Sequence, residues 1–129
     1  PASFKVSSTC TRVNVREGHT ESVFASTQKA CEPGDVARVM REFAGSSGEA
    51  ELPSAPKHMI IVQEDPFRPQ PRLDRAAEEG MATTVGRIRK DIVLENGIKY
   101  LLVSHNTKMG AARGAVLVAE LLIRDGYIS

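Results

Sequence analysis

An arginine and a histidine seven residues apart are the side chains of this sequence best suited to chemistry. Arg12 and His19 are separated by strand-like residues and by a turn at Gly18. A guanidinium can hold a carboxylate through two parallel N–H···O bonds, and an imidazole changes its protonation readily near neutral pH. At the junction of two strands, this pair could bind an acidic substrate and exchange a proton with it.

The same spacing also fits an ordinary surface hairpin, since arginine and histidine are mostly exposed or only partly buried. A second basic pair, Arg87 and Arg89, lies on one face of a predicted strand. That pair could hold a phosphate or a carboxylate of a neighbouring subunit, or it could simply face solvent. Both readings stay open for each pair at this point.

The cysteines and the other histidines predict no further reactive site. Cys10 lies on the apolar face of a predicted strand, so we expect a buried structural residue rather than a nucleophile. Cys31 precedes a helix and is expected to be inert as well. His58 and His105 lack cysteine, histidine or carboxylate neighbours at metal-ligand spacing, which predicts no metal site.

Hydrophobic periodicity predicts the elements that would position the Arg/His pair. Residues 3–15 alternate apolar and polar side chains with one change of phase, which predicts a strand with a bulge near the arginine. Residues 19–28 predict a second strand. The amphipathic spacing that follows Pro33 predicts a helix that ends at Gly45.

The second half of the sequence predicts three strands and a helix, at residues 58–63, 83–93, 98–104 and 107–125. The last two strands are joined by the hairpin signal Glu95-Asn96-Gly97. Loops are predicted over 45–57 and, because of its prolines, over 64–80. The last helix is apolar almost all round, so we expect it to be covered on several sides. The predicted fold class is therefore α+β, with a mainly antiparallel sheet and two packed helices.

Composition excludes several functional classes. The 129 residues fit one domain, and 41% of them are hydrophobic, which is enough for a core. Seventeen basic and sixteen acidic residues give a net charge of +1, which argues against a nucleic-acid partner. No apolar stretch reaches the roughly 18 residues of a membrane span, and no signal peptide is visible. Two cysteines in such a chain favour a cytoplasmic location.

Several segments of the sequence resemble one enzyme family. Residues 8–19 are similar to the carboxylate-binding Arg and general-base His motif of the aspartate-semialdehyde dehydrogenases, in their fungal and archaeal branch. Residues 83–91 and 99–112 are similar to that family's last strands and to the start of its last helix, in the same order and at the same separation. With Pro71-Arg-Leu-Asp74 and Gly80-Met81, the resemblance covers nearly the whole chain, but only the C-terminal part of the enzyme.

The resemblance implies roles for individual residues. Arg12 would bind the substrate's carboxylate, and His19 would be the general base that takes the proton of a cysteine thiol. Asn106, Thr107 and Gly110 would contact the cofactor NADP at the start of the last helix, where free N–H groups also face a ligand. An ordinary helix cap is the alternative role for Asn106.

The resemblance also implies a domain assignment. Residues 1–129 would be the C-terminal part of the catalytic and dimerisation domain, a domain like that of glyceraldehyde-3-phosphate dehydrogenase, and the NADP-binding domain would be absent. The sequence contains no G-x-G-x-x-G turn and opens on Pro1. The last helix would pack against the absent domain. We therefore expect a fragment of a larger enzyme that is inactive alone.

The function implied for the intact enzyme is reduction of aspartyl phosphate to aspartate semialdehyde with release of phosphate, on the route to lysine, methionine and threonine. Family members assemble as homodimers, and some as tetramers. Two alternatives stay open. A malonyl-coenzyme A reductase resembles the archaeal branch and would use the same arginine. A non-catalytic oligomerisation module would need only the assembly surfaces.

Overall fold

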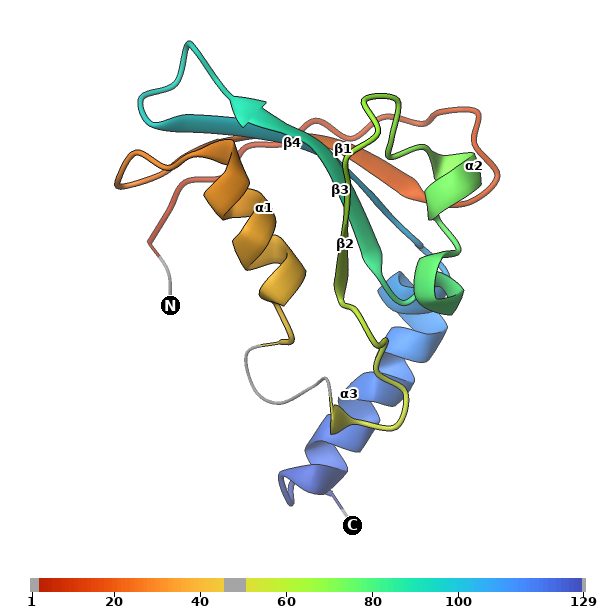
Figure 1. The fold of residues 1–129 in the computed structure, drawn as a ribbon. Coiled ribbons are helices and arrows are strands. Elements are labelled where there is room, and N and C mark those ends of the chain that lie inside the picture. The colour runs from red at the N-terminus through yellow and green to blue at the C-terminus, as the bar shows by residue number, and fades with distance from the viewer. Residues whose placement is uncertain (1–2, 46–50, 129) are drawn as a thin grey trace.

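The computed structural model describes residues 3–45 and 51–128, and a four-stranded sheet in the order β1-β4-β3-β2 forms its centre (Figure 1). The strands are β1 His19–Ser26, β2 Ile60–Gln63, β3 Thr83–Lys90 and β4 Gly97–Ser104. β4 pairs antiparallel with both β1 and β3, whereas β2 and β3 are parallel. The predicted α+β class is confirmed, and the sheet is mixed with mostly antiparallel pairing.

Helices lie on both sides of this sheet. α1 Pro33–Glu42 packs against β2 and β3, and the short α2 Pro71–Asp74 lies against β4. Figure 1 shows α1 and α2 on opposite sides of β3. The predicted helix after Pro33 is confirmed, and Gly45 follows its end with a φ of 92°. The buried apolar residues are Leu52, Met81, Ala82, Val85, Ile98 and Val103.

The last helix begins with a π-helical segment, η3 Lys108–Ala112, and continues as α3 Arg113–Arg124. Gly126 follows it with a φ of 76°, which a glycine adopts without the steric cost of a side chain. The expectation that this helix is covered on several sides is not met within the described chain, since no residue of α3 is buried. Figure 1 shows α3 extending away from the sheet. No helix in residues 3–45 or 51–128 is long and apolar enough to cross a bilayer.

The predicted first strand is wrong. Residues 3–15 contain no strand, and Phe4 and Val6 are exposed. Alternation of side chains can indicate an extended backbone, but a strand also needs a neighbour for its hydrogen bonds, and this segment has none in the described chain. The predicted burial of Cys10 is wrong for the same reason, because its side chain is exposed.

The proline-rich segment is ordered by a buried carboxylate. Asp74 is 1% exposed and accepts hydrogen bonds from the Arg68 guanidinium, including one of 3.1 Å from Nε, and from the backbone N–H of Gln70 at 2.6 Å. The hydrogen bond to Asp74 raises the pKa of the Arg68 guanidinium above its ordinary value. The segment lies directly on β3, where a Cβ on Gly86 would be 2.5 Å from the Arg68 carbonyl oxygen. It then passes through the short helix η2 Ala77–Gly80 into β3.

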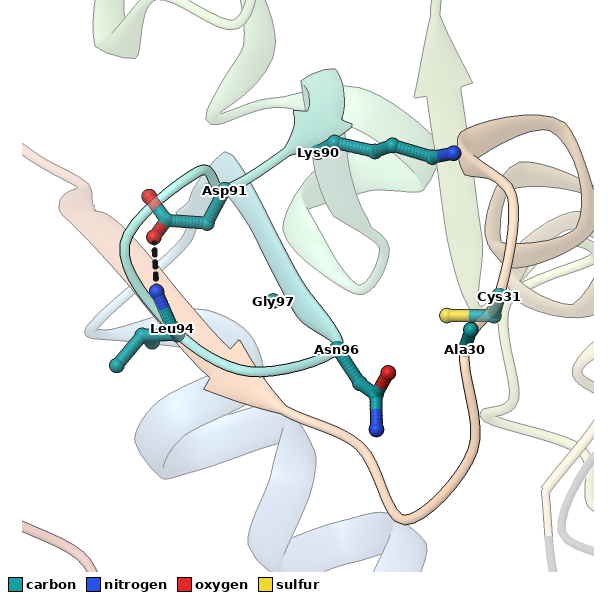
Figure 2. A pocket seen from close by; sticks show the side chains of 7 residues that line it. All are labelled: Ala30, Cys31, Lys90, Asp91, Leu94, Asn96 and Gly97. Atoms are coloured by element: carbon teal, nitrogen blue, oxygen red, sulfur yellow. Dashed lines mark hydrogen bonds between the residues drawn. The ribbon is translucent and has the colours of Figure 1, made fainter.

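The β3–β4 connection is organised by Asp91. Its Oδ1 accepts hydrogen bonds from the backbone N–H groups of Val93 and Leu94, at 2.9 and 2.8 Å, and its Oδ2 lies 3.0 Å from Lys99 Nζ. Figure 2 shows the bond to Leu94 beside a cavity of about 210 Å³. The predicted hairpin is confirmed, with Asn96 at a φ of 50° as the turn signal requires. The backbone bonds first, and then Lys99, lower the pKa of Asp91 from 3.8 to about 2.

The Asp91 carboxylate is expected to make the protein less stable in acid. The pKa of Asp91 is lower in the folded than in the unfolded protein. The contribution of ionised Asp91 to the free energy of unfolding is therefore complete above about pH 4 and is lost as the pH falls through about 2. The midpoint temperature of thermal unfolding, measured from pH 6 to pH 2.5, should therefore fall more steeply with decreasing pH for the natural protein than for Asp91→Asn. Glu95→Gln changes an exposed carboxylate of the same connection and should retain the natural slope. Parallel curves for all three proteins would contradict this prediction.

Candidate functional site

His19 lies where two neighbouring strands meet the start of the last helix. It is the first residue of β1, and its register partner is Ser104, the last residue of β4. The His19 side chain is exposed, so a ligand can reach it. The chain enters β1 through Gly18 and leaves β4 toward His105 and Asn106, which brings two distant parts of the sequence together.

Gly18 sets the direction in which the chain enters β1. Its φ of 103° is in the region that favours glycine, and the residue is buried. A Cβ here would lie 3.3 Å from the Cβ of Arg75 and 3.7 Å from that of Pro71, so α2 also restricts this position. The Gly18 N–H donates a 2.9 Å hydrogen bond to Oδ1 of Asn106. A turn and a helix start 88 residues apart are thus joined directly.

Glu17 and Thr107 make a second connection beside the first. The Thr107 hydroxyl donates a hydrogen bond to Glu17 Oε2 at 3.1 Å. Buried His105 lies between them and uses Nδ1 to accept from the backbone N–H groups of Thr107 and Lys108, at 3.3 and 3.4 Å. These contacts place the His105 ring against the first turn of the last helix. The distance from that nitrogen to Glu17 Oε2 is 3.8 Å, too long for a hydrogen bond.

The bond from Gly18 fixes how Asn106 presents its amide. A backbone N–H can only donate, so the atom that faces it must be the amide oxygen. The Nδ2 group has no hydrogen-bond partner among residues 3–45 and 51–128, and Asn106 is partly exposed. Asn106 therefore offers the two N–H donors of Nδ2 to an incoming ligand.

The start of the last helix has unusual backbone geometry. Hydrogen bonds of the i→i+5 type run from Gly110 N to His105 O at 3.0 Å and from Ala112 N to Thr107 O at 3.2 Å. Such π-helical turns occur often at functional sites. A Cβ on Gly114 would lie 2.1 Å from the Met109 carbonyl oxygen, so this helix register needs glycine there. Gly110 is exposed, and Thr107 and Gly110 both lie on the solvent side of the helix start.

The structure brings some predicted site residues together and leaves one apart. Asn106 and Thr107 contact the turn that carries His19, and Gly110 follows within the same helical segment. Arg12 lies in the exposed stretch before the turn, and its side chain makes no hydrogen bond or ion pair within the described residues. The pairing of Arg12 with His19 on one substrate stays a prediction. Within residues 3–45 and 51–128, no group of three or more His, Cys, Asp or Glu side chains is placed to hold a metal.

Sequence reasoning missed Glu17, His105 and Gly114. Glu17 and His105 are immediate neighbours of predicted site residues, but their contacts cross most of the chain and have no local signal. Gly114 could have been noticed as a glycine inside a helical pattern, where it usually has a packing reason. The cavity in Figure 2 is lined by none of the predicted site residues and lies beside Gly97, at the other end of β4 from His19's partner Ser104.

Comparison with known proteins identifies the family. Residues 1–109 match the model of the semialdehyde dehydrogenase dimerisation domain. The chain is 46% identical over 122 residues to the aspartate-semialdehyde dehydrogenase of Methanothermobacter thermautotrophicus, covering 95% of the chain and 35% of that protein. It is 42% identical over 130 residues to the Saccharomyces cerevisiae enzyme, covering 99% and 35%. The chain thus spans about a third of the length of the curated relatives it matches.

Solved structures agree. The aspartate semialdehyde dehydrogenase with NADP from Candida albicans superposes with a TM-score of 0.71 at 39% identity, covering 86% of this chain and 31% of that one. The aspartate semialdehyde dehydrogenase II complexed with ASA from Vibrio cholerae gives 0.64 at 28% identity, with 84% and 28% covered. Because the family model accounts for most of the chain and the fold agrees with solved members, this chain belongs to the semialdehyde dehydrogenase dimerisation-domain family.

Proposed function

We propose that the chain is the substrate-binding and dimer-forming part of an NADP-dependent aspartate-semialdehyde dehydrogenase. The complete enzyme would be cytoplasmic and reduce aspartyl phosphate to aspartate semialdehyde, with release of phosphate, for lysine, methionine and threonine synthesis. The observation that carries the proposal is that exposed His19 lies on a buried glycine turn held by Asn106, in a chain 46% identical to a curated member of this family.

In this proposal Arg12 and His19 have separate roles, substrate binding and proton transfer. The Arg12 guanidinium binds the free carboxylate of the substrate, and His19 removes the proton from a cysteine thiol supplied outside residues 1–129. The resulting thiolate attacks the carbonyl carbon. Exposure of both side chains supports this role, because neither is committed to a partner within the described residues. Without that cysteine and a nucleotide-binding domain, the chain alone is expected to be inactive.

The residues at the helix start fit a nicotinamide cofactor. Asn106 Nδ2 offers donors for a carboxamide oxygen, and Gly110 leaves room for a close approach, since it carries no side chain. We propose that Asn106, Thr107 and Gly110 hold the nicotinamide end of NADP, whose reduced form, NADPH, would supply the hydride. Asn106, Thr107 and Gly110 would then only position the ring. NADP in the Candida albicans relative supports the choice of cofactor.

An assay of the complete enzyme tests the proposed reaction. We expect NADP reduction that requires both aspartate semialdehyde and phosphate, and none above background from the 129-residue chain alone. Oxidation of NADPH with malonyl-coenzyme A as the acceptor, without activity toward the semialdehyde, would assign the alternative reductase. Turnover by the isolated chain would contradict its proposed dependence on a second domain.

We also propose that the chain supplies the surface for a homodimer, or for the dimers of a tetramer. The matched family model describes a dimerisation domain, and large apolar side chains such as Phe24, Val118 and Ile123 are more than half exposed. Apolar surface of this kind often marks an interface. Light scattering at micromolar concentration should therefore give twice the 14.0 kDa of one chain or more. A monomer would contradict the assembly role.

A further inference from the structure

We propose that Asn106 is a positioning residue for His19, acting through the backbone of Gly18. The inference rests on the proposed catalytic role of His19 and goes beyond a ligand contact by Asn106. It concerns the turn–helix link, which we define as the two hydrogen bonds Gly18 N–H···Asn106 Oδ1 and Thr107 Oγ1–H···Glu17 Oε2.

The first step concerns the need of Gly18 for an acceptor. A buried backbone N–H almost always has a hydrogen-bond partner, because leaving it unpaired costs most of its desolvation. Gly18 precedes β1, so its N–H lies outside the β1–β4 ladder that begins at His19. Asn106 provides the acceptor from the far end of the chain. The conformation of this turn therefore depends on a side chain outside it.

The second step concerns what surrounds His19. Its register partner is Ser104, its preceding residue is bonded to Asn106, and the residue before that is bonded to Thr107. All three contacts come from one short segment, residues 104–107. The backbone position from which the His19 ring projects is consequently set by the end of β4 and the start of the last helix.

The third step follows from the orientation of the amide. Oδ1 of Asn106 holds the turn while Nδ2 faces away from Gly18 and is unpartnered within the described residues. An amide is planar and rigid, so a ligand oxygen bound at Nδ2 and the backbone of the His19 turn are held in a fixed relation by one group. This geometry aligns the base with whatever binds at the helix start.

Hydrogen exchange in the isolated 129-residue chain tests the turn–helix link and requires no enzymatic activity. Asn106→Ala should accelerate hydrogen exchange of the Gly18 amide about tenfold. This factor corresponds to the usual free-energy contribution of one hydrogen bond to a buried group. Asn106→Asp keeps an oxygen acceptor and should restore most of the protection. Gln28→Ala removes an exposed amide near the opposite end of β1 and serves as the matched control. Unchanged exchange in Asn106→Ala, with a native spectrum, would overturn the proposed link.

The complete enzyme tests positioning. Asn106→Ala should lower kcat about tenfold with the KM for the semialdehyde nearly unchanged, and Asn106→Asp should recover part of that loss. In a His19→Asn background, Asn106→Ala should change kcat by less than about twofold, because the two residues act as a unit. Equal losses in both backgrounds, with a raised KM for NADP, would show a cofactor contact only and overturn the inference. His19→Asn with natural kcat would instead refute the proposed function and leave the exchange result standing.

Discussion

Replacing His19 with asparagine in the complete enzyme is expected to lower kcat by roughly 10²–10⁴-fold, the range for loss of a general base. Asparagine keeps a polar group of similar reach at the end of the turn but cannot take the thiol proton. Because the side chain is exposed and makes no hydrogen bond within the described residues, the fold should be unaffected. Steady-state kinetics with aspartate semialdehyde would measure the change, with the KM expected to stay nearly constant.

His58 offers the matched control for this substitution. It is also an exposed histidine, but its Nδ1 lies 2.9 Å from Glu78 Oε1. This contact lowers the pKa of Glu78 below 4.5. His58→Asn should leave kcat within about twofold of the natural value. Similar losses from both substitutions would mean that neither histidine is the base.

The second large effect is expected at Arg12. Arg12→Lys should raise the KM for the substrate and lower kcat, since an ammonium cannot reproduce two parallel hydrogen bonds to a carboxylate. Loss of a charge-assisted pair amounts to about 1.5–3 kcal/mol, or about ten- to a hundredfold in kcat/KM. Measured kcat/KM values for the two proteins would give this difference directly.

Arg16 lies in the same exposed stretch and serves as the control for charge and position. Arg16→Lys keeps the positive charge and should leave kcat/KM unchanged. Unchanged kinetics in Arg12→Lys would return Arg12 to the role of a surface residue. It would also show that a group other than the Arg12 guanidinium binds the carboxylate.

Elements with local signals were predicted well from the sequence. α1 begins at the predicted proline, and β3 and β4 are joined at the predicted turn, because capping residues, glycines and periodicity act over only a few positions. The last helix was also found, although its π-helical start has no recognised local pattern.

Elements that depend on distant partners were predicted poorly. Residues 3–15 have the alternation of a strand but no ladder partner in this chain, and the burial of Cys10 failed with that strand. The bulge expected there occurs instead in β3, between Gly86 and Arg89, where Arg87 has a φ of 57°. The family resemblance predicted Asn106 as a site residue, but its bond to Gly18 depends on the closure of the whole sheet.

The pairing of β1 with β4 also constrains the order in which the molecule can assemble. β4 is joined to β3 by a short connection, whereas Ser26 and its partner Gly97 are separated by most of the chain. Closing a long loop costs conformational entropy that only later contacts repay. We therefore expect the β3–β4 hairpin to form first and β1 to add to its open edge afterwards. His19, as the first residue of that edge strand, reaches its position only when the most non-local contacts of the protein have formed.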